Sequence, residues 1–216
     1  MAYYLVLAIV FSSLLSGCQL TPLASEYFEI PSGGVLFQDD FSDPSSGWQN
    51  RTFGDYAALD YFDGYYRIQV SGENQMVWGG TGLNFSDIRL ETDAIKVIGD
   101  VDDMFGIVCR AVDQDNFYFF AISSDGYYGI GKKVKGIQSM IGAKGMLPSE
   151  VIAQGLSVNH LSVDCIGNQL NFRVNGHLVA SRNDIELSTG NVGLLAGNFA
   201  SQNNIVLFDN FSVINP

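Results

Sequence analysis

Basic residues, proline and histidine are scarce in this sequence of 216 residues. Lys and Arg together number 11 against 23 Asp and Glu, which gives a formal net charge of −12. Because binding to nucleic acid requires a basic surface that neutralises phosphates, this charge balance argues against a nucleic acid partner. Only 5 prolines occur beside 24 glycines, and 12% of the residues are aromatic, a profile typical of many short strands joined by tight turns.

Motifs for several common chemistries are missing as well. His160 and His177 are the only histidines, and they lack the spacing of a zinc site or a partner set for a histidine-based triad. The sequence contains no nucleophile elbow, phosphate-binding loop or dinucleotide fingerprint. We therefore expect no organic cofactor.

The N-terminus carries a targeting signal. Residues 3–14 form a mostly apolar run that is too short to span a bilayer comfortably, and Leu15-Ser16-Gly17-Cys18 follows it. This tetrapeptide resembles the lipobox of bacterial lipoproteins, in which the Cys is lipidated and becomes the new N-terminus, although no Lys or Arg precedes the apolar run. The resemblance implies a signal peptide over residues 1–17, palmitate and other lipid on Cys18, and a membrane-anchored protein exported to the bacterial cell envelope. Residues 18–34 lack periodicity and read as a flexible tether, so a single domain is expected over residues 35–216.

The cysteine count fits an exported protein. If Cys18 carries lipid, Cys109 and Cys165 remain as an even pair. Each lies on the apolar face of a strand pattern, so both are expected to point into the interior. A disulfide between them is predicted for an oxidising compartment, and two buried free thiols are the alternative.

The alternation of side chains predicts an all-β fold. Residues 105–111, 116–122 and 127–132 form three successive strand patterns, and Asp125-Gly126 marks a tight turn in which both residues need positive φ. Asn175-Gly176 marks another hairpin. Short strands are also expected over residues 75–78 and 136–146, and only residues 148–154 suit a helical turn. About a dozen strands without a repeat predict one two-sheet antiparallel sandwich rather than a barrel.

Several motifs resemble concanavalin-like (laminin-G-like) jelly-roll domains of exported bacterial proteins. They are Asp39-Asp40-Phe41-Ser42-Asp43 with Trp48, the segments 105–110 and 116–119, Val174-Asn175-Gly176, Val192-Gly193-Leu194 and Phe208-Asp209-Asn210-Phe211. Among such domains the sequence resembles the 3-keto-disaccharide hydrolase domain, the family-16 glucanases and non-catalytic sugar-binding modules. The resemblance implies a jelly-roll sandwich and leaves open whether the domain cleaves a sugar or only binds one.

Charged residues on one long strand pattern suggest a binding face. Arg89, Glu91 and Asp93 alternate with uncharged residues and so share one face. The glucanases carry Glu-x-Asp-x-(x)-Glu on such a strand; here Glu91 and Asp93 match the first two positions, and Ile95 or Lys96 stands where the second Glu is needed. Because that pair of carboxylates is incomplete, glycan binding without catalysis is the leading interpretation. Glycoside cleavage by Glu91 and Asp93 is the second, and a structural or protein-binding envelope module is the third.

Aromatic and charged side chains are expected to complete a groove for a glycan or another small ligand on the concave face of one sheet. A charge ladder that pairs Arg89, Glu91 and Asp93 with Arg110 is the alternative for the charged residues, and packing in the sandwich core is the alternative for the aromatic residues. The predicted binding set is Trp78, Arg89, Glu91, Asp93, Arg110, Tyr118 and Tyr128.

Acidic residues at the two ends of the domain suggest a structural metal site, and Asp100, Asp102 and Asp103 in a loop form a second candidate. Asp39 and Asp40 follow the first strand pattern and Asp209 lies on the last, and first and last strands of such sandwiches often pair. Oxygen-rich clusters suit Ca²⁺, although ordinary acidic turn residues explain the same pattern.

Overall fold

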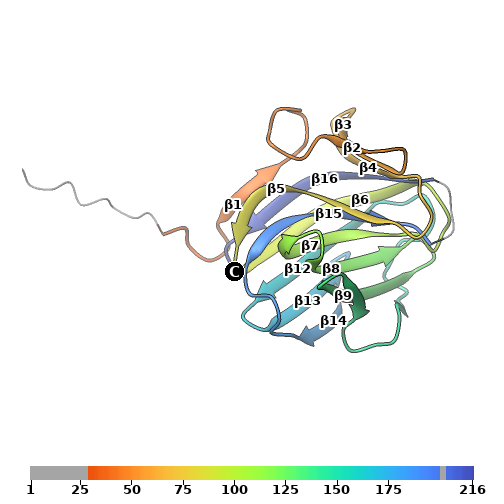
Figure 1. The fold of residues 1–216 in the computed structure, drawn as a ribbon. Helices are drawn as coiled ribbons and strands as arrows, with labels where there is room; N and C mark the ends of the chain where they lie inside the picture. The colour runs from red at the N-terminus through yellow and green to blue at the C-terminus, as the bar shows by residue number, and fades with distance from the viewer. Residues whose placement is uncertain (1–28, 200–202) are drawn as a thin grey trace, which may run out of the picture.

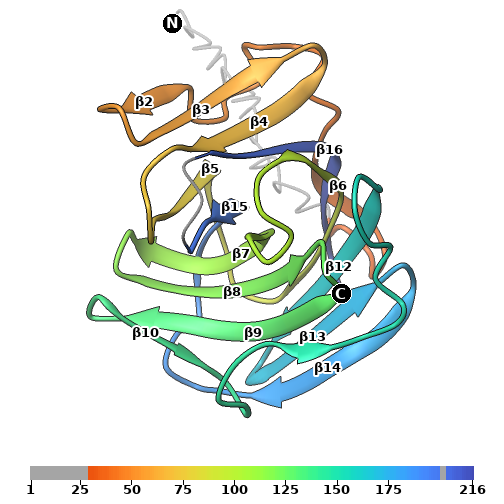
Figure 2. The same ribbon diagram turned by 90° about the vertical axis from the view of Figure 1, so that its right-hand side faces the viewer.

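The computed structural model describes residues 29–199 and 203–216 and consists of two antiparallel sheets that face each other (Figures 1 and 2). In spatial order, the nine-stranded sheet contains β14 (His177–Asn183), β13 (Gln169–Val174), β12 (Asn159–Ile166), β6 (Ile88–Ile98), β16 (Asn204–Ile214), β4 (Tyr65–Val70), β3 (Ala57–Phe62) and β2 (Arg51–Phe53), and β1 (Val35–Asp39) also pairs with β16. The seven-stranded sheet contains β10 (Ile137–Met140), β9 (Tyr127–Val134), β8 (Asn116–Ser123), β7 (Met104–Asp113), β15 (Gly190–Gly197) and β5 (Met76–Phe85), and β11 (Leu147–Pro148) pairs with β9. The predicted two-sheet sandwich is confirmed.

The predicted leader at residues 1–17 and the lipidation site at Cys18 lie outside the described residues, as does most of the predicted tether. Within residues 29–199 and 203–216 no helix is long and apolar enough to cross a membrane.

Local turn chemistry explains most of the hairpins. Asn175 and Gly176 both have positive φ, 51° and 81°, as a two-residue hairpin turn requires. Asp63-Gly64 makes the same turn between β3 and β4, with φ of 51° and 78°. At Asp125-Gly126 the prediction was wrong in detail, because only Gly126 has positive φ and the connection between β8 and β9 spans three residues.

Some strand boundaries differ from the predictions. The strand expected at residues 75–78 is β5, which continues to Phe85 through the exposed residues Gly82, Leu83 and Asn84. The strand expected at residues 136–146 ends at Met140, and residues 148–154 contain no helix. The short strand β2 lies at the edge of its sheet.

The main hydrophobic core lies between the sheets, and the disulfide crosses it. Alternate residues of the seven-stranded sheet, such as Phe105, Ile107 and Phe120, pack against alternate residues of the nine-stranded sheet, such as Leu161 and Phe172. Cys109 on β7 and Cys165 on β12 are bonded to each other, which confirms the predicted bridge. The bond joins residues 56 positions apart and so ties the two sheets together.

The outward face of the seven-stranded sheet carries a second apolar cluster, called the aromatic face below. It consists of Trp78, Met104, Val108, Ala111, Phe117, Phe119, Ala121 and Leu195, with Met76, Met140 and Met146 packed against them. The rings of Trp78 and Phe117 approach to 6.0 Å although β15 and β7 separate their strands. Neighbouring strands lie about 4.8 Å apart, so these side chains must lean toward each other across the face. Glycine makes this close packing feasible, because a Cβ on Gly131 would lie 2.1 Å from the Phe119 ring.

Candidate functional site

The candidate site forms where β16 changes its pairing partner. Residues Asn204–Phe208 of β16 pair with β4, whereas Phe211 and the residues after it pair with β1. Between these two partners β16 contains a bulge: three steps from Asp209 to Ser212 oppose two steps from Asp93 to Glu91 on β6. Asn210 has a φ of 53°, a left-handed conformation that Asn tolerates better than most residues. The bulge leaves a gap in the outward face of the nine-stranded sheet.

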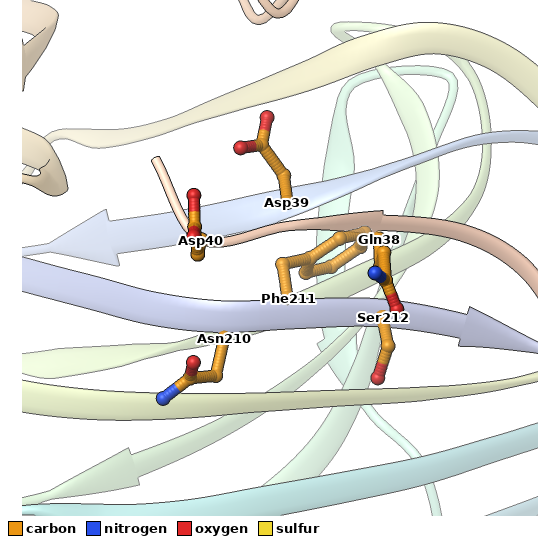
Figure 3. Close-up of a pocket in the computed structure, with 6 residues that line it drawn as sticks. All are labelled: Gln38, Asp39, Asp40, Asn210, Phe211 and Ser212. Atoms are coloured by element: carbon orange, nitrogen blue, oxygen red, sulfur yellow. The ribbon is translucent and has the colours of Figure 1, made fainter. Parts of the chain in front are cut away.

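Two hollows flank this bulge. One has a volume of about 380 Å³ and is lined by Gln38, Asp39, Asp40, Asn210, Phe211 and Ser212 (Figure 3). In Figure 3 the side chains of Gln38 and Ser212 lie beside each other, as their direct pairing between β1 and β16 requires. The other hollow has a volume of about 240 Å³ and is lined by Tyr65, Asp93, Ala94, Ile95, Val158, Leu207 and Asp209. It combines an aromatic ring, aliphatic side chains and two carboxylates.

A row of polar side chains begins in the second hollow, at Asp209 and Asp93, and continues beyond it. Asp209 lies directly opposite Asp93, and Asp93 lies directly opposite His160 on β12. His160 Nδ1 is 2.8 Å from Asp93 Oδ1, and Asn210 Nδ2 donates to Asp93 Oδ2 at 3.0 Å. Tyr65 is the next residue of β4 beyond the last pair with β16, which places its ring at the Asp209 end of the row. Residues from four strands and a bulge thus meet at one position.

Ionisation of the Asp209 carboxyl is unfavourable in the folded protein. Burial raises the pKa of its carboxyl, and the negative charges of Asp93 and Asp40 raise it further, while the backbone N–H of Asn210 opposes the shift. Directly opposed residues have Cβ atoms about 5 Å apart, so two ionised carboxylates repel each other here. The fold therefore brings two mutually repelling carboxylates together beside an aromatic ring.

The charge ladder on the same face has a different partner from the one predicted. Asp164 on β12 is buried and accepts hydrogen bonds from Arg89 Nε and from Arg173 Nη1, both at 2.7 Å. Glu91 accepts a longer bond from Ser162 Oγ, at 3.3 Å. Burial opposes ionisation of Asp164, but its hydrogen bonds to Arg89, Arg173 and Asn171 outweigh it and lower the pKa of the carboxyl. The outward face of the nine-stranded sheet is thus a connected polar surface.

Arg110 is a structural residue. Its side chain is 2% exposed and lies at a bulge of β7 with a φ of 52°. All five of its N–H donors are used, on Asp87 Oδ1 and on the backbone carbonyls of Ser86, Cys165, Gly167 and Leu187. The prediction that Arg110 binds a ligand or pairs with Arg89, Glu91 and Asp93 is wrong. Arg110 belongs to the seven-stranded sheet, and its hydrogen bonds hold the loops at Ser86, Gly167 and Leu187 in place.

The aromatic residues of the predicted groove do not meet the charged ones. Tyr118 is buried, and its hydroxyl donates to Asp184 and accepts from the Leu187 N–H. Tyr128 packs against the main core, and Trp78 is buried in the aromatic face. Arg89, Glu91 and Asp93 lie on the outward face of the nine-stranded sheet, so the predicted single groove does not form. The alternation of side chains cannot reveal which sheet a strand joins, and this is why the set was wrongly combined.

The predicted calcium ligands are not assembled as a metal site. Asp39 accepts hydrogen bonds from the Phe41 N–H and Ser46 Oγ, and Asp40 accepts from the N–H and Oγ of Ser42. In the described part of the chain no group of three or more His, Cys, Asp or Glu side chains is arranged to hold a metal ion. Asp39 and Asp40 act instead as acids that close local turns.

Three residues at or beside the hollow were absent from the predicted binding set: Tyr65, which lines it, and His160 and Asn210, which hydrogen-bond to Asp93 at its edge. His160 was set aside because it has no second histidine nearby, although its position opposite Asp93 is what matters. A signal for Asn210 exists, since Asp209-Asn210 interrupts an otherwise alternating strand with two residues that favour turns and bulges.

No family model and no curated protein matches this sequence. Solved structures do match, at low identity. The carbohydrate binding module CBM66 from Bacillus subtilis matches with a TM-score of 0.62 and 17% identity, over 78% of this chain and 96% of its own. The β-glucanase of Bacillus licheniformis matches with a TM-score of 0.62 and 12% identity, over 85% and 99%. A Bacillus subtilis protein of unknown function with a galectin-like fold matches with a TM-score of 0.61 and 12% identity, over 86% and 97%. These similarities confirm that the chain adopts a concanavalin-like, galectin-like jelly roll.

Proposed function

We propose that this protein binds a carbohydrate, without cleaving it, in the 240 Å³ hollow between Tyr65, Asp93 and Asp209. The observation that carries the proposal is the combination, in that hollow, of an aromatic ring with two directly opposed carboxylates. The pKa of one of them, Asp209, is raised. Sugars stack their C–H faces on aromatic rings and donate hydroxyl hydrogen bonds to carboxylates. A carbohydrate binding module among the proteins with the same fold is in keeping with this function.

The polar groups fit a hydroxyl-rich ligand better than an acidic one. Asp93, Asp209 and Asn210 offer several acceptor oxygens, while His160 is the basic neighbour at one end of the row. A uronic acid or another anionic sugar would place a further negative charge beside two carboxylates. Neutral or amino-bearing sugars are therefore the expected ligands.

A glycan array with and without Ca²⁺ tests the proposal. We expect binding of neutral or amino sugars that is independent of Ca²⁺ and is lost in Tyr65→Ala and Asp93→Asn. Glu91→Asn serves as a control on the same face, because Glu91 does not line the hollow. Absence of glycan binding by the wild-type protein would contradict the proposal, as would binding that survives in both variants.

Glycoside cleavage is the second candidate, and the carboxylate pair favours it. Retaining glycosidases use two carboxyl groups about 5 Å apart, one of them with a raised pKa. Asp93 and Asp209 lie directly opposite each other on neighbouring strands, and the pKa of Asp209 is raised. Glu91, the acid predicted from the sequence, contacts Ser162 outside the hollow instead. An assay for release of reducing sugar from a bound oligosaccharide tests this candidate. Release by the wild-type protein that is lost in Asp209→Asn would show that the protein is a glycosidase.

We further propose that the protein is exported and anchored to the membrane of the bacterial envelope through lipid on Cys18. The apolar run at residues 3–14 and the Leu15-Ser16-Gly17-Cys18 sequence support this. Labelling of cells with a palmitate analogue should mark the wild-type protein and not Cys18→Ala. Equal labelling of the two would contradict the anchor.

A further inference from the structure

A small pocket lies at the end of the sandwich opposite to the entry of the chain. The turn after β6 and the segment before β12 meet there, whereas residue 35 pairs with residue 214 at the other end of β16 (Figure 1). The pocket has a volume of about 230 Å³ and is lined by Lys96, Val97, Ile98, Gly99, Val101, Ser124, Gly155 and Leu156. The pocket shares no lining residue with the hollow that contains Ile95 and Asp93, so the two are separate sites.

Two buried polar groups lie in its wall. Lys96 is 6% exposed, and its Nζ donates a hydrogen bond to the backbone carbonyl of Asp100. Ser124 is 4% exposed, and its Oγ has no hydrogen-bond partner among the described residues. A buried hydroxyl without a partner costs free energy, which a ligand atom in the pocket would recover. An ammonium group has three N–H donors, so Lys96 also has donors beyond the one that Asp100 accepts.

The charge around Lys96 determines which ligand atom suits the pocket. Burial lowers the pKa of Lys96, while the negative charges of Asp103, Asp102, Asp125 and Asp100 act in the opposite direction. Four carboxylates thus act on the ammonium group through space. A ligand carboxylate would be repelled by these four acids, and a ligand ammonium would be repelled by Lys96 and would leave its donors unused. A neutral oxygen acceptor meets neither difficulty.

The rim of the pocket is apolar and accessible. Ile98 is 48% exposed, Val101 58% and Leu156 71%, and all three line the same pocket. Exposed aliphatic residues that surround a polar floor are typical of a site for a ligand with one polar head and an alkyl chain.

We propose that this pocket binds a neutral compound in which a carbonyl oxygen is attached to a short alkyl chain, such as an acyl amide. The carbonyl oxygen accepts hydrogen bonds from Lys96 Nζ and Ser124 Oγ, and the alkyl chain packs against Ile98, Val101 and Leu156. The site is independent of the glycan site, and each can fail without the other.

Titration of the 15N-labelled full domain with hexanamide, hexanoate and hexylamine tests the head group, because the three share one alkyl length. We expect hexanamide to shift the amide resonances of residues 96–101, 124, 155 and 156 with a dissociation constant on the order of 1 mM, as suits a ligand of so few atoms. Hexanoate and hexylamine should bind about tenfold more weakly. Equal affinity for all three compounds, or shifts confined to other residues, would overturn the proposal.

Two variants test the wall and the rim separately. Ser124→Ala should weaken hexanamide binding about fivefold, the effect of one lost neutral hydrogen bond. Leu156→Asn alters an exposed side chain, so the fold is expected to tolerate it, and it should weaken binding at least as much. Leu178→Asn, at a position that is 56% exposed on β14 and outside the pocket, is the matched control and should bind like wild type. Wild-type affinity in both Ser124→Ala and Leu156→Asn would refute the site.

Discussion

The outward face of the nine-stranded sheet carries Arg89, Glu91 and Asp93, whereas the outward face of the seven-stranded sheet carries Trp78, Phe117 and Phe119. Both sheets turn an apolar face inward, so the two outward faces are where they differ. On the polar face, side chains pair across strands and leave two hollows beside the bulge at Asn210. On the aromatic face, large rings pack over glycine positions and fill the surface themselves.

This difference assigns separate roles to the two sheets. In the aromatic face the rings contact each other and are buried, so they contribute to the free energy of unfolding. In the polar face the carboxyl of Asp209 has a raised pKa beside Asp93, so its ionisation opposes folding at neutral pH. Substitutions on the two faces should therefore separate folding from binding.

The largest effect is expected from Phe119→Ala on the aromatic face. Phe119 is buried against Phe117 and Gly131, and removing such a ring should lower the free energy of unfolding by about 3–4 kcal/mol. Glu91→Gln on the polar face should change it by less than about 0.5 kcal/mol. Urea denaturation of the disulfide-bonded proteins measures both. Equal effects of the two substitutions would remove the distinction between the faces.

The next largest loss of stability is expected at Asp164, the buried carboxylate on the outward face of the nine-stranded sheet. Asp164→Asn should cost about 2 kcal/mol at pH 7, because two arginine hydrogen bonds lose their charged acceptor. The folded-state pKa of Asp164 is lowered, so its contribution is present above the ordinary Asp pKa and is lost as the pH falls through the folded-state pKa. Thermal unfolding between pH 7 and pH 2 should show the difference from wild type shrinking at the acid end. Asp60→Asn, in a more exposed pair with Arg67, should cost less than about 1 kcal/mol. A loss for Asp164→Asn that does not depend on pH would contradict this assignment.

A smaller effect is expected at the glycine positions of the aromatic face. The Cβ of Gly131→Ala would meet the Phe119 ring at 2.1 Å, so the ring must move, at a cost of about 1–3 kcal/mol. A Cβ on Gly145 meets nothing within 4 Å, and Gly145→Ala should be nearly neutral. Chemical denaturation of the two alanine variants compares them directly. A neutral Gly131→Ala would show that the rings are not tightly packed.

The smallest expected effect is a gain in stability instead of a loss. Because the folded-state pKa of Asp209 is raised, the protonated carboxyl favours folding at low pH, and this contribution is lost as the pH rises through that pKa. Asp209→Asn should therefore stabilise the protein at pH 7, by less than about 1 kcal/mol since the site is partly exposed, and should have no such effect near pH 3. Asp63→Asn, in a turn that Asn also favours, is the control. Destabilisation by Asp209→Asn at pH 7 would contradict the repulsion inferred between Asp209 and Asp93.

Much of the fold could be predicted because strand alternation and turn chemistry are local. Asp63-Gly64 and Asn175-Gly176 specify their hairpins, and the apolar sides of Cys109 and Cys165 pointed to the bridge that joins the sheets. The order of strands in each sheet is not local, and residues 88–98 and 105–111 carry similar patterns although they belong to different sheets.

The site could be predicted only in part for the same reason. Arg89, Glu91 and Asp93 were placed correctly on one face, but Arg110, Tyr118 and Trp78 were joined to them from the other sheet. The hollow depends on β16 leaving β4 and joining β1, and on the left-handed Asn210 between them. No periodicity marks a change of partner, so Tyr65 and His160 could be assigned only from the structure.

Calorimetric titration of the glycan selected on the array against wild type, Asp209→Asn and Asp63→Asn separates the role of Asp209 in binding from its effect on folding. We expect Asp209→Asn to lose glycan binding while its unfolding temperature at pH 7 stays equal to or above that of wild type, and Asp63→Asn to bind like wild type. Undiminished binding by Asp209→Asn would contradict it.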